Sequence, residues 1–170
     1  YFGAGQAVAG LVIIAAAFSG PIYSKLLGIK DKNNFKYNLT LQVYFIILFL
    51  SLIIAFSKQA LFTLNPIYID VYIIVIILSI KFAFYSLGGV LEVSLLGIEK
   101  IDLNSKINYK AYIKSKLFFV PSIINMKFAV YLVSLTLFFI IANENYSLLE
   151  LITGWALLSL GTEIIFTTYL

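Results

Sequence analysis

Long apolar runs alternate with short polar connectors along the whole chain. Residues 39–56 carry no charge, residues 117–142 carry only Lys127, and residues 148–170 carry only Glu150 and Glu163. These runs are continuous and do not alternate with a period of two residues, as the strands of an outer-membrane barrel would. A helix needs about 20 residues to cross a hydrocarbon core of about 30 Å. The pattern therefore predicts an all-α, polytopic membrane protein.

Five segments are long and apolar enough to be membrane spans: residues 2–27, 39–56, 66–97, 112–142 and 148–170. The first is rich in Gly and Ala, which let helices approach closely in lipid, and Pro21 is expected to kink its far end. The third, at about 46 Å if fully helical, has to tilt or bend, and Gly88–Gly89 is its natural hinge. The fifth opens with a capping-box spacing, Ser147 to Glu150. No soluble domain fits between the spans, so residues 1–170 are expected to form one transmembrane domain.

All twelve basic residues are lysines, and most of them lie in every second connector. The connectors 25–38 and 99–116 hold four and five lysines, whereas the connectors 57–65 and 143–147 hold one and none. Lysine-rich connectors stay on the cytoplasmic side of a membrane. We therefore expect a multi-pass protein of the cytoplasmic membrane, whose first segment runs from outside to inside and whose last segment ends in the cytoplasm.

The second basic connector has helical spacing, because Lys106, Lys110 and Lys114 recur every four residues. Apolar residues accompany them, which predicts an amphipathic helix that lies on the membrane surface and leads into the fourth span. We expect this cytoplasmic basic loop to mark topology and to contact membrane lipids, at about 1 kcal/mol per lysine near anionic headgroups. Capture of a lipid phosphate is the alternative role.

Composition indicates the same class of protein and narrows its chemistry. Charged residues make up 12% of the chain, about half of the 25% that is usual in soluble domains. The net charge of +4 does not indicate nucleic-acid binding, because the lysines lie beside spans. The chain has no Cys and no His, which excludes disulfides and Cys/His metal sites. We expect no catalytic residues, no metal, no cofactor and no nucleic-acid partner, so the protein is not predicted to be an enzyme.

Charged residues inside the predicted spans are the candidate functional residues. Lys81 lies in the middle of the third segment, where a lysine costs about 2.5–3.5 kcal/mol on insertion scales. Three helical turns later, Glu92 completes a stripe that also contains Tyr85 and Gly88. Lys81 and Glu92 lie about 16 Å apart along the helix axis and cannot pair directly. Each needs a partner on another helix, for which Lys127 and Glu163 are the candidates, or a hydrated cavity.

Two interpretations of these charges remain open at this point. In the functional one, Lys81, Glu92, Lys127 and Tyr85 line a hydrated cavity suited to a polar or anionic cargo. In the structural one, a Lys–Glu pair only fixes helix packing, or side chains snorkel to an interface. Glu163 and Asp70 are expected closer to a membrane face.

Several stretches, taken in order, carry a family resemblance. Residues 1–7 (YFGAGQA) lead to residues 19–26 (SGPIYSKL), followed by residues 61–68 (LFTLNPIY) and residues 94–102 (SLLGIEKID). Together they resemble the C-terminal half of polysaccharide and lipid-linked oligosaccharide flippases, above all archaeal ones. This family belongs to the multidrug/oligosaccharidyl-lipid/polysaccharide exporter superfamily. The resemblance covers nearly the whole chain.

The resemblance implies that the five segments are helices eight to twelve of a 12- or 14-helix transporter with two lobes. Its partner would be the N-terminal lobe of the same protein, and its cargo a lipid-linked glycan moved by alternating access between the lobes. Both ends of such transporters are cytoplasmic, so an eighth helix runs from outside to inside. The lysine pattern predicts that direction independently.

Three other functions compete with the flippase. A cation-coupled multidrug exporter of the same superfamily usually has a carboxylate cluster in a lobe, and here Glu92 and Glu163 stand isolated in the sequence. A membrane-embedded glycosyl- or phosphotransferase would use carboxylates near the cytoplasmic face, such as Glu99 and Asp102. A membrane scaffold without transport activity is the third alternative.

Overall fold

The computed structural model describes residues 1–18, 32–98, 109–142 and 146–170. Within these ranges every regular element is a helix, which confirms the all-α prediction. In chain order the elements are α1 (Phe2–Ala9), the 3-10 helix η1 (Gly10–Phe18), α3 (Lys32–Leu64), the 3-10 helix η2 (Pro66–Val71), α4 (Tyr72–Ile98), α5 (Tyr109–Ile113), α6 (Lys116–Ala142) and α7 (Leu148–Tyr169).

Four segments in the described ranges are long and apolar enough to cross a membrane. They are Leu39–Leu64, Pro66–Leu96, Lys116–Ala142 and Leu148–Tyr169, which correspond to the second to fifth predicted spans. In the first predicted span the described apolar helix, Phe2–Ile14, is shorter than a span requires. Its backbone changes from α to 3-10 geometry at Gly10. The rest of that segment, with Pro21, lies outside the described residues.

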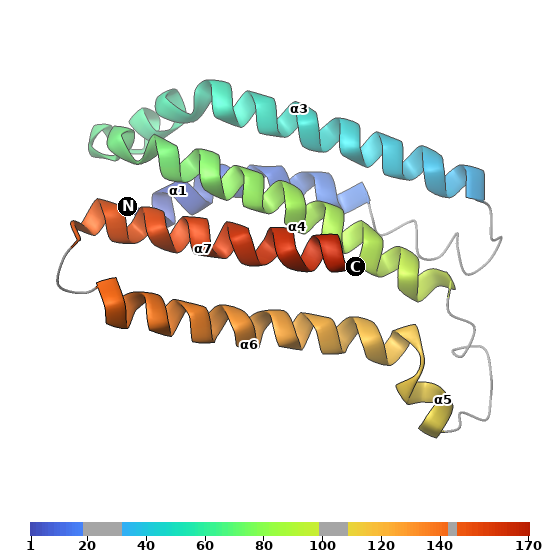
Figure 1. The fold of residues 1–170 in the computed structure, drawn as a ribbon. Coiled ribbons are helices and arrows are strands. Elements are labelled where there is room, and N and C mark those ends of the chain that lie inside the picture. The colour runs from blue at the N-terminus through green and yellow to red at the C-terminus, as the bar shows by residue number, and fades with distance from the viewer. Residues whose placement is uncertain (19–31, 99–108, 143–145) are drawn as a thin grey trace.

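Helix α4 is the centre of the bundle. In Figure 1 the long helices lie side by side, with α4 between α3 and α7, and α6 beyond α7. Helix α1 and η1 also pack on α4. Buried residues occur on most sides of this helix, and they include Ile74, Val75, Leu78, Ser79, Phe82, Ala83, Ser86 and Val90. Most faces of α4 therefore pack against a neighbouring helix, which determines what its charged side chains can meet.

Each of the surrounding helices buries one stripe of residues spaced three or four apart, as helix packing requires. On α3 the buried stripe contains Gln42, Ile46, Ile53, Ser57 and Leu61. On α7 it is small and polar, with Ala156, Ser159, Glu163 and Thr167. On α6, residues 120, 123, 127, 131, 134, 138 and 142 are buried or half-buried. Lys127 therefore lies on the face of α6 that packs against α7.

The second span is longer than predicted. Helix α3 continues to Leu64, so most of the predicted connector 57–65 is helical. Its buried stripe continues through Ser57 and Leu61, and packing against the core extends the helix past the sequence boundary. The break comes at Asn65, whose side-chain oxygen accepts a hydrogen bond from the Ile67 backbone N–H at 3.0 Å. Pro66 follows and has no N–H to donate.

The fourth predicted segment is divided in two. Helix α6 begins at Lys116 rather than at residue 112, and the short helix α5 precedes it, ending at Ile113. Only part of the predicted amphipathic helix is described, since Lys106 lies outside the described residues. Lys110 and Lys114 are both exposed.

Two local predictions for the other spans have different outcomes. The capping box at the start of α7 is confirmed, because Glu150 accepts a hydrogen bond from the Ser147 backbone N–H at 2.8 Å and the Ser147 hydroxyl accepts one from the Glu150 N–H. Helix α4 runs unbroken through Gly88 and Gly89, so a hinge there stays a prediction. Gly88 instead allows a close approach, since a Cβ at this position would lie 3.2 Å from the Thr167 hydroxyl oxygen.

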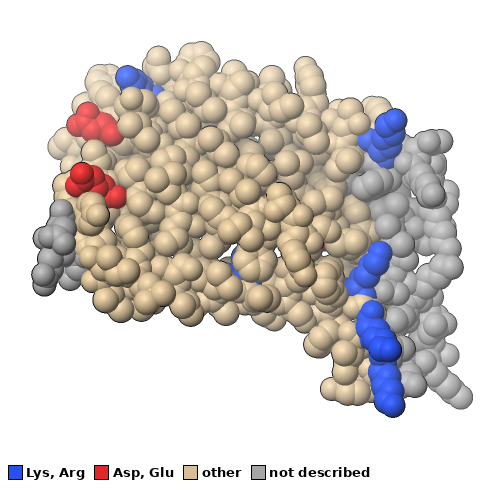
Figure 2. All heavy atoms as spheres, in the orientation of Figure 1, with Lys and Arg blue, Asp and Glu red and all other residues tan. Residues whose placement is uncertain are grey.

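Charge separates along the length of the bundle. One end, where α3 begins and α4 ends, carries lysines of α3, of α5 and of the start of α6 (Figure 2). The opposite end carries Asp70 of η2 and Glu150 of α7, together with Lys58 near the end of α3. In Figure 1, α1, α4 and α7 all run toward the lysine-rich end, while α3 and α6 run away from it.

Candidate functional site

Four charged side chains from three helices meet along the contact between α4, α6 and α7. Lys81 and Glu92 come from α4, Lys127 comes from α6, and Glu163 comes from α7; we call this group the polar seam. Each residue lies on the helix face that packs against a neighbour, which follows from the buried stripes. All four lie within the four apolar segments that are long enough to cross a membrane.

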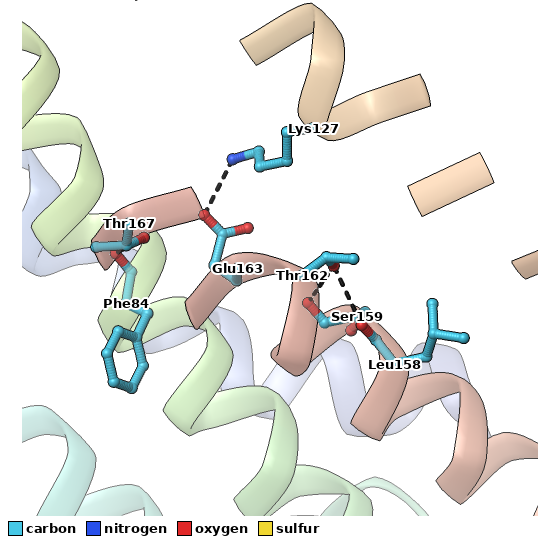
Figure 3. A network of polar contacts seen from close by, with 7 residues as sticks. All are labelled: Phe84, Lys127, Leu158, Ser159, Thr162, Glu163 and Thr167. Atoms are coloured by element: carbon cyan, nitrogen blue, oxygen red, sulfur yellow. Dashed lines mark hydrogen bonds and ion pairs between the residues drawn. The ribbon is translucent and has the colours of Figure 1, made fainter. Parts of the chain in front are cut away.

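The centre of the polar seam is an ion pair. The Lys127 Nζ donates to the Glu163 Oε1 at 3.0 Å, and the two side chains are only 14% and 9% exposed (Figure 3). Neither charge has much contact with solvent, so each depends on the other for compensation. The structure buries Glu163 between helices, and its expected position near a membrane face stays a prediction.

A recess of about 90 Å³ opens on the Lys81 side of the ion pair. Its lining residues are Lys81, Lys127, Phe128, Tyr131, Ser159, Thr162 and Glu163. The Tyr131 hydroxyl oxygen accepts a hydrogen bond from the Trp155 Nε1–H at 2.6 Å, which leaves the Tyr131 O–H able to donate. The recess therefore presents two ammonium groups, a phenol and a carboxylate, and it has room for a few water molecules.

A second, much smaller recess of about 10 Å³ lies on the Glu92 side. It is lined by Gly88, Glu92, Ile123, Ile124, Lys127, Glu163, Phe166, Thr167 and Leu170. Lys127 and Glu163 line both recesses. The ion pair is therefore the wall that the two recesses share.

The ion pair lies between the other two charges of the polar seam. Lys81 lines only the larger recess and Glu92 only the smaller one, whereas Lys127 and Glu163 line both. Lys81 and Glu92 are therefore the end members of the seam. Among the described residues, the two end members make no ion pair. The structure thus pairs the central charges and leaves one cation and one anion at the ends.

Of the other residues that the sequence singled out, Tyr85 lies beside the seam and the basic loop does not. The Lys127 Nζ lies 5.6 Å from the centre of the Tyr85 ring, a cation–π distance. Lys110 and Lys114 are at the lysine-rich end, outside both recesses. No group of three or more His, Cys, Asp or Glu side chains that could hold a metal occurs in the described ranges.

Several polar residues beside the polar seam were not identified from the sequence. Tyr131 follows Lys127 by one helical turn, and Ser159 and Thr167 flank Glu163 by one turn on either side. This i, i+4 spacing is the signal that would have found them. The Thr167 hydroxyl donates to the Phe84 carbonyl at 3.3 Å and ties α7 to α4 (Figure 3).

A separate polar contact joins α3 to α4. The Gln42 side-chain amide donates to the Ser86 carbonyl at 3.0 Å and to its hydroxyl at 3.2 Å. Gln42 is fully buried, and its Oε1 has no hydrogen-bond partner among the described residues. Such contacts hold helices together in lipid, where backbone and side-chain polar groups find no water.

Comparison with known proteins found no matching family model, no similar curated protein and no similar solved structure. The resemblance to flippases therefore depends on the sequence stretches alone.

Proposed function

We propose that this chain is part of a transporter that flips lipid-linked oligosaccharide or polysaccharide precursors across the cytoplasmic membrane. The observation that carries the proposal is the polar seam, with two lysines and two glutamates held between apolar helices. Charged residues are costly inside a bilayer and occur there mainly where they face a polar path. The flippase resemblance names the class of cargo that such a path would serve.

The number of charges favours a path over a purely structural contact. A packing contact needs one Lys and one Glu, and Lys127 and Glu163 already supply them. Lys81 and Glu92 add two half-buried charges without an ion pair in the described ranges. Retaining such charges has a cost in stability, which a role in contacting cargo would explain.

The size of the Lys81 recess limits its role. At about 90 Å³ it admits a few water molecules or one small polar group. We therefore propose that the seam is one wall of a larger path, completed by the N-terminal lobe of the same protein. The glycan headgroup would move along this wall while its lipid tail stays among the membrane lipids.

The proposed orientation places the lysine-rich end in the cytoplasm. Lysines at the start of α3, in α5 and at the start of α6 gather at that end, and acidic side chains gather at the other. This distribution is typical of the positive-inside rule. The first segment would then enter from outside, and α7 would end on the cytoplasmic side.

Replacement of Lys81 tests the proposal. In the natural protein reconstituted in vesicles, Lys81→Ala should reduce translocation of a lipid-linked glycan at least tenfold, on the order of 1.4 kcal/mol of lost interaction. Lys81→Arg, which keeps the charge, should retain more activity. Lys58→Ala is the matched control, because Lys58 is exposed at the far end of α3. Equal translocation by Lys81→Ala and Lys58→Ala would remove the seam from the cargo path.

A cation-coupled multidrug exporter is the second candidate. The sequence suggested that Glu92 and Glu163 are isolated, but they line one recess together. Such a carboxylate pair could bind a coupling cation. Transport assays in the same vesicles distinguish the two candidate functions. The exporter would be favoured if an imposed ion gradient drove efflux of a cationic drug, if Glu92→Gln abolished this efflux, and if no glycan were translocated. Neither activity would be expected of a scaffold.

A further inference from the structure

The polar seam allows two ways of pairing its charges, because each recess brings one end charge together with both members of the ion pair. In the observed setting Lys127 pairs with Glu163, and within the described ranges Lys81 and Glu92 make no ion pair. In a shifted setting Lys81 would pair with Glu163, and Lys127 would pair with Glu92. The shifted setting gives every charge a partner.

The recesses make the shifted setting reachable. Lys81 and Glu163 line the larger recess, and Lys127 and Glu92 line the smaller one. Lysine side chains are long and flexible, so their ammonium groups can change partners. The shift replaces the ion pair between α6 and α7 by one pair from each of these helices to α4, so the spacing between α6 and α7 is expected to change with it. Lys81 and Glu92 cannot pair with each other across about 16 Å of α4. The seam therefore has these two settings, and a third setting in which Lys81 pairs with Glu92 is excluded.

The observed setting leaves Glu92 in an unfavourable position if it is ionised. Glu92 is half-buried, and within the described residues no cation lies within ion-pair distance of it. A half-buried carboxylate without a cationic partner is costly, and binding a proton removes that cost. Glu92 lies six residues before the end of α4 at the lysine-rich end, about 9 Å along the axis. A proton could reach it from that side.

We propose that the polar seam is a two-setting ion-pair switch and that Glu92 is its proton-binding site. In the observed setting Glu92 is a carboxylic acid, and the seam carries a net charge of +1. On the shift, the Glu92 O–H bond breaks and the proton leaves to solvent. The carboxylate then pairs with Lys127, Glu163 pairs with Lys81, and the seam becomes neutral. Proton binding therefore controls whether the Lys81 recess is cationic.

In the part of the chain that the structure describes, few other titratable groups surround Glu92. Lys127 and Tyr131 face the seam from α6, Glu163 faces it from α7, and Lys81 and Tyr85 share α4 with Glu92. Helices α1 and α3 contribute no residue to either recess. A protonated-carboxyl signal from the seam can come only from its two carboxyl groups, Glu92 and Glu163, and variants separate them.

Infrared spectroscopy of the natural protein in lipid tests the proton site. The wild type should show a protonated-carboxyl stretch that disappears as the pH is raised. Glu92→Gln should lose this band. Glu163→Gln should lose it as well, because Lys127 is then free to pair with Glu92. Asp70→Asn, on an exposed side chain far from the seam, should keep it. A band that persists in Glu92→Gln, or no band in the wild type at any pH, would overturn the proposal.

A distance measurement tests the switch itself. The chain has no native Cys, so spin labels can be placed at the exposed positions Met126 of α6 and Ile165 of α7. In the Asp70→Asn control, which keeps the carboxyl band, the distance between the two labels should change over the same pH range as the band. In Glu92→Gln the distance should not depend on pH. A change that survives in Glu92→Gln would contradict the switch.

The proton site does not depend on the identity of the cargo, although its effect on transport rests on the proposed function. The two can fail separately. If the carboxyl band of Glu92 is observed but no glycan is translocated, only the flippase proposal is overturned. If the glycan is translocated but Glu92 gives no carboxyl band, only the switch is overturned.

Discussion

Lys127 is the residue on which the polar seam depends, because it compensates Glu163 at 3.0 Å and also faces Glu92. Lys127→Met breaks the buried pair and leaves Glu163 dependent on a shift of Lys81 toward it. We expect it to lower the free energy of unfolding by about 3 kcal/mol. The double variant Lys127→Met/Glu163→Leu should recover most of this loss, since it removes both charges. Unfolding in detergent, followed by circular dichroism, measures both effects. If both variants were as stable as the wild type, the Lys127–Glu163 pair would not contribute to the stability of the fold.

Individual residues of the seam differ in how far they could be predicted. Lys81, Glu92 and Lys127 were identified from the sequence because a charge inside an apolar span is unusual in any fold. Tyr131 and Ser159 were not, because hydroxyl groups are common in spans and are often satisfied by their own helix. Tyr131 and Ser159 lie beside the seam only because of the residues that face them from the neighbouring helix. For the same reason the sequence could not determine which residue pairs with Lys127.

At the scale of elements, the contact between α6 and α7 depends on a glycine. A Cβ at Gly154 would lie 2.5 Å from Phe138 Cζ, so Gly154→Ala forces the ring or the helix to move. We expect it to destabilise the protein by about 1–3 kcal/mol. Gly161→Ala is the matched control on the same helix, because nothing lies within 4 Å of its added Cβ. It should stabilise by up to about 1 kcal/mol through helix propensity. Thermal unfolding of the two variants in detergent should move in opposite directions, and equal effects would contradict the packing described.

The ends of helices could be predicted from the sequence where the residues that cap or break the helix lie next to the boundary. The capping box of Ser147 and Glu150 and the Asn65–Pro66 break use side chains within three residues of the boundary. The extension of α3 to Leu64 has another cause, since it follows from the burial of Leu61 in the core. The change to 3-10 geometry after α1 has no signal that we recognise beyond Gly10.

At the scale of the whole molecule, the separation of charge predicts accessibility from opposite sides of the membrane. Lys58→Cys lies at the acidic end and Lys114→Cys at the lysine-rich end, and both positions are exposed. In intact cells a membrane-impermeant maleimide should label Lys58→Cys. Lys114→Cys should react only after the membrane is opened. The absence of native Cys makes the readout specific. The reverse pattern would invert the proposed orientation.

The sequence by itself determined that the chain is helical, where most of its spans lie and which residues are candidates for function. These properties depend on the length of apolar runs and on the cost of charge in lipid, and neither requires knowledge of helix contacts. Only the tertiary structure decided that Lys127 pairs with Glu163, and that Lys81 and Glu92 stand at the two ends of one seam. Those contacts depend on the register between α4, α6 and α7, which is set by packing across three helices and by no local pattern.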